Sequence, residues 1–65
     1  MNKKIIGKKL RELRGKETIK SVAAAVGISY SALAMYERGS RIPRDEIKIK
    51  LANYFNVSVE TIFFV

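Results

Sequence analysis

Apolar residues recur at helical spacing along the first part of the chain. Ile6, Leu10 and Leu13 follow one another at intervals of four and three residues, and charged side chains fill most of the positions between them. Residues with this spacing lie on one side of an α-helix, so the pattern predicts an amphipathic helix over residues 5–14. Gly15 is a residue suited to ending it.

Two shorter helices are predicted between Thr18 and Gly39. Thr18 is a suitable N-terminal cap for the first of them, and Gly27 supplies the left-handed turn that ends it. Ser29 caps the second helix, which Gly39 closes. The residues of these two helices that are expected to face the core are Val22, Ala23, Val26, Leu33 and Tyr36.

Two further helices are predicted in the rest of the chain. Pro43 precedes a fourth helix, where Asp45 and Glu46 suit the positive end of the helix dipole. Ser58 is the expected cap of a last short helix that runs into the final residues. The buried stripe expected on the fourth helix consists of Ile47, Leu51, Tyr54 and Phe55. With no strand pattern, the sequence predicts an all-α fold, a compact five-helix domain that comprises residues 1–65.

The outer face of the predicted third helix has an unusual composition. With Leu33 at the centre of the buried side, a step of about 100° per residue places Ser31, Ala34, Met35 and Arg38 on the opposite side. An ordinary exposed face carries Glu, Lys and Gln, whereas this one carries a hydroxyl, a methyl and a thioether beside one arginine. This face is therefore a candidate contact surface.

The chain contains neither cysteine nor histidine. Disulfides and thiolate metal sites are excluded, and the common general bases, nucleophiles and transition-metal ligands are missing. The six carboxylates show no paired spacing, so we expect no enzymatic activity, no metal and no cofactor. The first residues, MNKKIIGKK, include only two consecutive apolar side chains. We therefore expect neither a signal peptide nor a membrane span, and a cytoplasmic location.

Positive charge is concentrated in two parts of the chain. Thirteen Lys and Arg against six Asp and Glu give a net charge of +7. Residues 1–20 hold eight basic and two acidic groups, residues 38–50 hold five and two, and residues 21–37 contain no Lys or Arg. Such charge can serve solubility alone, but its segregation favours a polyanionic partner. At this point the partner could be DNA, RNA or an anionic membrane.

Residues 19–38 resemble the helix-turn-helix of the Cro/phage-repressor (Xre-like) family of DNA-binding transcriptional regulators. The positions that this motif reserves for apolar, small or glycine residues are occupied by Val22, Ala23, Val26, Gly27, Ile28, Leu33 and Tyr36. The segments IGKKLRELR, ERGSRIP and NVSVETIF are also similar to corresponding family segments, so nearly the whole chain is covered. The resemblance implies that the third helix lies in the DNA major groove and that the second braces it.

The resemblance also implies which side chains face DNA bases. The expected base contacts are Ser29, Tyr30, Ser31, Ala34 and Met35. Arg, Lys, Asn and Gln, which read guanine or adenine through paired hydrogen bonds, are missing from residues 29–37. Recognition is therefore expected to depend on thymine methyl groups, single hydroxyl contacts and DNA shape. Glu37 and Arg14 match a pair that ties the third helix to the first in this family.

Phosphate contacts are expected from basic side chains around the motif. The candidates are Lys20, Arg38, Arg41, Arg44 and Lys48, and Lys3 and Lys4 are expected to form a mobile arm. Two positions depart from the family pattern. Ile19 stands where a phosphate-binding glutamine is common, and Arg44 stands where a capping serine or threonine is frequent. Anchoring is therefore expected to shift toward Lys20 and backbone amides.

Apolar residues at the end of the chain exceed what a small core needs. Ile62, Phe63, Phe64 and Val65 are expected to form a two-fold dimer interface, although the core can absorb the first two. The predicted function is a sequence-specific double-stranded DNA-binding regulator, a repressor that binds an inverted-repeat operator as a homodimer, with no small-molecule ligand. The alternatives are a small antitoxin or accessory module that binds a protein, and a nonspecific RNA or membrane-surface binder.

Overall fold

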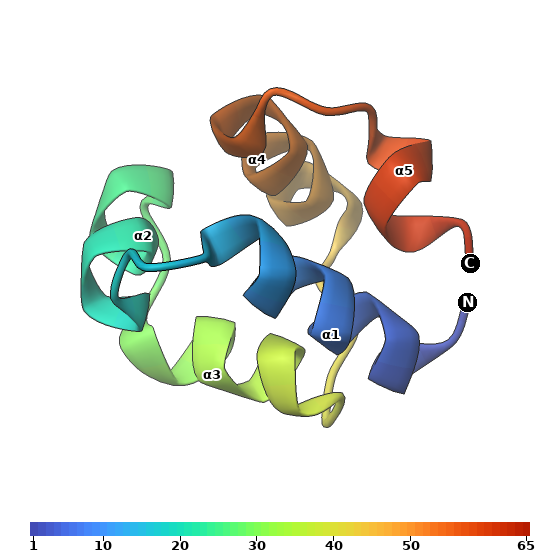
Figure 1. Cartoon of the computed structure of the whole chain (residues 1–65), viewed down its shortest axis with the longest axis horizontal. Coiled ribbons are helices and arrows are strands. Elements are labelled where there is room, and N and C mark those ends of the chain that lie inside the picture. Colours follow the sequence, from blue (N-terminus) through green and yellow to red (C-terminus); the bar gives the residue numbers. More distant parts are fainter.

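The computed structural model describes residues 1–65 and confirms the all-α fold with five helices. The helices are α1 (Lys3–Arg14), α2 (Ile19–Val26), α3 (Tyr30–Arg38), α4 (Asp45–Phe55) and α5 (Val59–Phe63). As Figure 1 shows, α1 crosses the middle of the molecule, with α3 on one side of it and α4 and α5 on the other. α2 lies at the end remote from the two chain termini, which lie side by side.

Short polar side chains cap four of the five helices. Thr18, Ser29 and Ser58 each accept a hydrogen bond from the backbone N–H three residues ahead, at 3.0, 3.0 and 3.2 Å. Each bond satisfies one of the amide groups that have no partner at a helix start. These three caps confirm the sequence prediction. Arg44 occupies the cap position of α4 and makes no such bond.

The start of α1 differs from the prediction. Asn2 caps this helix by accepting from the N–H of Ile5 at 3.1 Å, so Lys3 and Lys4 belong to the first helical turn. They therefore do not form a mobile arm. The side chain of Lys4 also lies against the Gly39 turn at the end of α3, which fixes the beginning of α1 beside the end of α3.

A single apolar core lies between the helices. Its buried members are Ile6, Leu10, Val22, Ala23, Val26, Leu33, Tyr36, Leu51, Ala52, Ile62 and Phe63. Tyr54 was expected in this core but is exposed, because its hydroxyl donates a hydrogen bond to the carboxylate of Glu17 in the α1–α2 connection. This bond raises the pKa of Tyr54 above its ordinary value of 10.0.

α1 and α3 approach each other so closely that one position tolerates only glycine. A Cβ atom at Gly7 would collide with the carbonyl oxygen of Glu37 and would lie 2.8 Å from that of Tyr36. The backbone of α3 therefore packs directly on the backbone of α1 at this crossing.

An ion pair completes the junction of α1 and α3. The guanidinium of Arg14 donates from Nε to Glu37 Oε2 at 2.7 Å and from Nη2 to Oε1 at 2.9 Å. It also donates from Nη1 to the carbonyl oxygen of Glu17 at 2.7 Å. This confirms the expected tie between the end of α1 and the end of α3. The hydrogen bond to Glu37 raises the pKa of Arg14, which keeps the pair charged.

Candidate nucleic-acid interface

α2 and α3 meet at an angle of 113°, which lies in the range of helix-turn-helix motifs. The chain turns at Gly27, whose φ of 85° is in the left-handed region. Most L residues are strained in that region, so glycine is what allows Ser29 to cap α3 only two residues later. The inner side of α3 is buried in the core through Leu33 and Tyr36, which leaves the opposite side of this helix exposed to solvent.

The outer side of α3 is accessible, and its first turns carry uncharged side chains. Tyr30 and Ser31 are exposed at its first turn, and Ala34 and Met35 are partly exposed along its length. The hydroxyl of Ser29 already accepts the Ala32 N–H, so its remaining capacity is as a donor. The structure thus brings all five expected base-contact residues to one side of α3 or its leading end.

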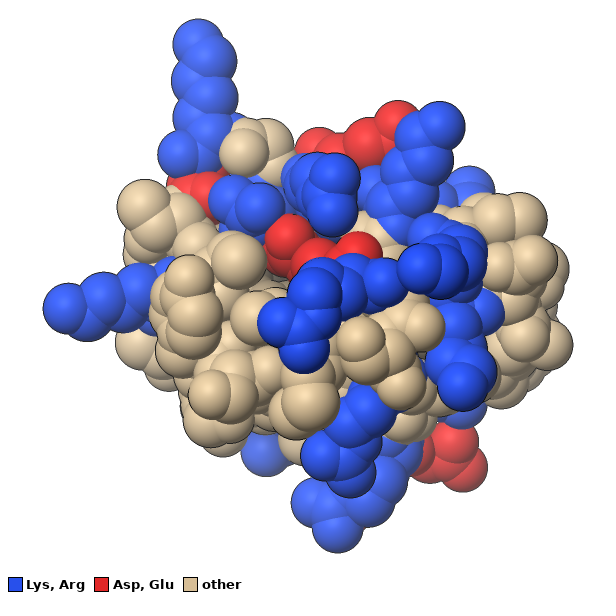
Figure 2. Space-filling view, turned by 90° about the horizontal axis from the view of Figure 1, so that it is seen from below, with Lys and Arg blue, Asp and Glu red and all other residues tan.

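Four of the five expected phosphate contacts are exposed around this surface. They are Lys20 on α2, Arg38 at the end of α3, and Arg41 and Arg44 in the α3–α4 connection. Figure 2 views the molecule from below, the side on which α3 lies in Figure 1. Lys and Arg side chains spread over this face and outnumber the acidic side chains that lie among them. The face therefore presents positive charge around a nearly neutral helix, an arrangement suited to a phosphate backbone on either side of a groove.

Arg38 and Arg44, which follow the outer face of α3, make only weak polar contacts with other side chains. Arg44 Nη2 lies 3.7 Å from Glu46 Oε1, and both side chains are largely exposed, so this ion pair stabilises the fold little. Arg38 Nε lies 3.5 Å from the hydroxyl of Ser40, at the limit of a hydrogen bond. These guanidinium groups remain available to an external anion.

A hollow of about 390 Å³ lies between the turn and the α3–α4 connection. The residues that line it include Gly27, Ser29, Tyr36, Arg41 and Arg44. The sequence pattern indicates only a core position for Tyr36, because its spacing from Leu33 places its ring on the buried side of α3. The polar tip of a tyrosine was the signal that could have indicated a second role.

Lys48 does not lie on this surface. Its side chain is 9% exposed, and its ammonium is 3.3 Å from Asp45 Oδ1 and 3.5 Å from Met1 Sδ. It also lies 5.9 Å from the centre of the Phe63 ring, within reach of a cation–π interaction. A phosphate contact needs an accessible cation, so the prediction that Lys48 contacts phosphate is wrong.

The end of the chain is divided between core and surface. Ile62 and Phe63 are completely buried within one molecule, so they are not available to a dimer interface. Phe64 and Val65 follow the end of α5 and are 63% and 40% exposed. Only these two of the four expected interface residues offer apolar surface to a partner.

Comparison with protein families agrees with this geometry. A family model described as helix-turn-helix matches residues 8–62. Comparison with curated proteins and with solved structures gave no match. None of the five helices by itself is long and apolar enough to cross a membrane, and only α2 and α3 taken together, bent at the turn, reach that length and composition. The matched region contains α2, α3, α4, the turn between α2 and α3, and most of α1 and α5. The chain therefore belongs to the Cro/C1-type helix-turn-helix family of DNA-binding regulators.

Proposed function

We propose that this DNA-binding regulator is a repressor that occupies an inverted-repeat operator as a homodimer. The observation that carries the proposal is the outer face of α3, where uncharged side chains are accessible between exposed arginines and lysines. A helix with such a face can enter the major groove without burying unpaired charge, while the surrounding cations bind the phosphates on each side.

The side chains of α3 support a particular kind of sequence reading. Ala34 and Met35 supply apolar contacts suited to the methyl group of thymine, and Ser31 supplies one hydroxyl. Arg38 stands at the end of the helix, where it suits phosphate or a narrow minor groove. We therefore propose an operator rich in A·T pairs, read partly through its shape.

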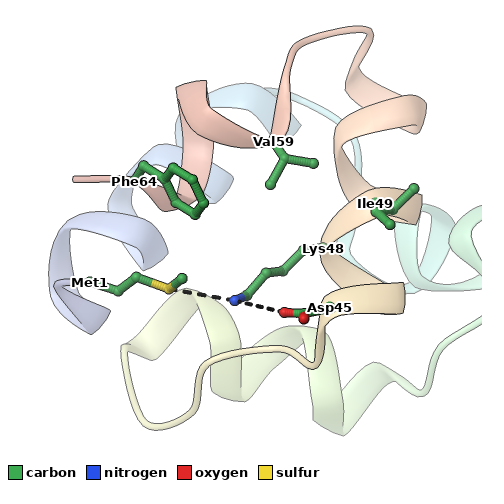
Figure 3. Close-up of a pocket in the computed structure, with 6 residues that line it drawn as sticks. All are labelled: Met1, Asp45, Lys48, Ile49, Val59 and Phe64. Atoms are coloured by element: carbon green, nitrogen blue, oxygen red, sulfur yellow. Dashed lines mark hydrogen bonds and ion pairs between the residues drawn. The ribbon is translucent and has the colours of Figure 1, made fainter.

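An apolar groove supports the dimeric state. It lies between α4 and α5, measures about 520 Å³ and is lined by Met1, Ile49, Val59 and Phe64, with Lys48 and Asp45 at one side (Figure 3). Met1 and Ile49 are 59% and 51% exposed, and Phe64 is exposed further still. Exposed apolar side chains that gather in one groove favour coverage by a partner. A second copy would cover it with an identical surface about a two-fold axis.

The test of this function is the selection of bound duplexes from a random DNA library at near-physiological salt, followed by sequencing. Enrichment of an inverted repeat with half-sites about ten base pairs apart is the expected result, because a two-fold dimer presents two copies of α3 one DNA turn apart. Binding without enrichment that collapses as salt rises would mean that charge alone holds the complex. Enrichment of a single, unrepeated half-site would reject the dimer but keep the sequence reading.

The same groove is the observation that favours a second function, an antitoxin or accessory protein whose apolar end binds another protein. In that case the groove is covered by the other protein. Light scattering of the purified wild type and of Phe64→Ser distinguishes the two, because self-association that this substitution removes requires the groove to accept a second copy.

A further inference from the structure

Tyr36 is the one residue of the α3–α4 hollow that combines deep burial with a free polar group. The whole residue is 8% exposed, and its ring belongs to the apolar core. Its hydroxyl makes no hydrogen bond to any protein group, and yet no buried side-chain nitrogen or oxygen in the chain lacks a partner. The exposed part of Tyr36 therefore includes its hydroxyl, and the surface to which this residue contributes is the hollow.

The lining of the hollow favours an anion. Two arginines, Arg41 and Arg44, line it, and none of its nine lining residues is acidic. Of the two arginines, only Arg44 forms an ion pair, at 3.7 Å from Glu46, and both of these side chains are largely exposed. The hollow is therefore positively charged, and a phenolic hydroxyl is a neutral donor that can complete the coordination of an anion.

The start of α3 adds further donors to this end of the molecule. Ser29 lines the hollow, and its hydroxyl is bonded to Ala32 while Leu33 donates to its carbonyl oxygen. The N–H groups of Tyr30 and Ser31 belong to the first turn and have no partner within the protein. Free amides at a helix start carry partial positive charge and favour an anion nearby.

We infer that the hollow is a phosphate subsite in which the Tyr36 hydroxyl donates to a phosphodiester oxygen held between Arg41 and Arg44. The inference rests on the proposed function, because it names the backbone group that this part of the DNA-binding face takes. Tyr36 then has two roles: its ring anchors α3 to the core, and its hydroxyl sets the distance between α3 and one strand of the duplex. A phosphate contact from the last turn of the reading helix limits how deeply and at what rotation α3 enters the groove.

The substitution that tests this inference is Tyr36→Phe. It removes the hydroxyl and keeps the ring, and because the hydroxyl has no partner in the protein, the melting temperature is expected to stay unchanged. The affinity for DNA is expected to fall about 10–100-fold, the effect of one lost hydrogen bond to a charged group. The loss should be equal for operator and random duplexes, with the salt dependence unchanged, because no charge is removed.

Tyr54→Phe is the matched control. It also removes one tyrosine hydroxyl, but that hydroxyl bonds to Glu17 and does not line the hollow. Its affinity for DNA is expected to equal that of the wild type. If Tyr36→Phe binds as tightly as the wild type while Arg41→Gln and Arg44→Gln each bind less tightly, the arginines hold phosphate without the hydroxyl and the inference is overturned.

A second measurement does not depend on DNA binding. Inorganic phosphate is titrated into the wild type and into Tyr36→Phe, and two sets of NMR resonances are followed, those of the aromatic ring at this position and those of the Arg41 and Arg44 Nε–H groups. In the wild type, these resonances are expected to shift saturably as phosphate is added. In Tyr36→Phe, the apparent affinity for phosphate is expected to be several-fold lower. Absence of shifts in the wild type overturns the subsite. Failure of the wild type to bind any duplex, with these shifts present, rejects the proposed function and leaves the subsite standing.

Discussion

The surroundings of Gly7 leave no room for a side chain. Its missing side chain allows α1 to rest on the carbonyl groups of Tyr36 and Glu37. Gly7→Ala gains helix propensity, worth about 0.5–1 kcal/mol. The new methyl group must, however, push two backbones apart, and overpacking of this kind costs typically about 1–3 kcal/mol and occasionally more. We expect a net loss of about 1–2 kcal/mol, measured by urea denaturation. Lys8→Ala, at the exposed neighbouring position, should change stability by less than about 0.5 kcal/mol.

Arg44 combines a poor helix cap with an expected phosphate contact. Its backbone has the extended conformation of a cap residue, but its side chain does not bond to the start of α4. Arg44→Ser should therefore raise stability by about 1 kcal/mol by adding a cap. The same change should weaken DNA binding and reduce the slope of log affinity against log salt by about 1. Thermal melts and binding isotherms at several salt concentrations measure both effects. Unchanged affinity at every salt concentration would remove Arg44 from the phosphate contacts.

Tyr54 gives the fold a specific response to high pH. Its hydrogen bond to Glu17 raises its pKa in the folded state above 10.0, so the folded chain keeps this proton at pH values where the unfolded chain has lost it. The stabilisation is complete below about pH 10 and is lost as pH rises through the folded pKa. The difference in stability between the wild type and Tyr54→Phe should therefore shrink above about pH 10. A difference that stays constant from about pH 8 to about pH 12 would contradict this assignment.

Local chemistry and tertiary contact explain which single residues could be predicted. Thr18, Ser29 and Ser58 bond within their own helical turn, so the sequence alone located them. Gly7 and Lys48 could not be read in this way, because their roles depend on α3 in one case and on Met1 and Phe63 in the other. The sequence pattern around a glycine within a helix is the same whether or not another helix packs on it. The pattern around a lysine on an amphipathic helix is likewise the same whether the lysine is buried or exposed.

The junction of α1 with α3 is the main determinant at the scale of whole elements. Arg14 and Glu37 lie 23 residues apart in the chain, and their two hydrogen bonds hold the end of α1 against the end of α3. The side chain of Glu37 is 4% exposed, so its loss leaves a partly buried guanidinium without its partner. The pair thus fixes the reading helix relative to α1, and its role is structural.

Glu37→Ala should lower stability by about 2–3 kcal/mol, a large part of the total for a domain of this size. The corresponding fall in melting temperature is roughly 4–8 °C per kcal/mol. DNA affinity measured well below the melting temperature should change little, because Glu37 does not lie on the outer face of α3. Glu60→Ala, at an exposed position of α5, is the control for losing one carboxylate. Lost DNA binding at unchanged stability would overturn the structural role.

The order and type of the elements were predictable, whereas their mutual fit was not. Periodicity and glycine turns located all five helices, and the resemblance of residues 19–38 to the family motif identified α2 and α3 as the functional pair. The hollow beside α3 forms because the turn at Gly27 lies close to the segment at Arg41 in the folded chain. No local sequence pattern predicts that these two segments are neighbours. For the same reason, Tyr36 could be assigned to the core but not to the hollow.

At the scale of the whole molecule, the apolar groove and the basic face occupy different surfaces. Phe64 lines the groove and belongs to neither the core nor the DNA-facing side of α3. Phe64→Ser should therefore leave the fold intact and weaken dimerisation at least about tenfold, measured by sedimentation equilibrium, because it removes a large apolar contact from each side of a two-fold interface. Binding to an inverted repeat should weaken in parallel, while binding to a single half-site should not.

Ile5→Ser is the control for this change. Ile5 is also an exposed apolar residue, but it lies on α1 and does not line the groove. Its replacement should leave the association constant unchanged. Equal effects of the two substitutions would show that general surface hydrophobicity, and not the groove, drives association.

The backbone N–H of Asn2 donates to the carbonyl oxygen of Val65 at 3.2 Å, so the two ends of the chain already touch (Figure 1). A short linker could therefore join them into a covalent ring without moving any helix. Such a ring restricts mainly the unfolded chain, and a loop-entropy estimate for its length gives a stabilisation of up to about 4 kcal/mol. Cyclisation would thus strengthen a very small domain while leaving every side chain of its DNA-facing surface as it is.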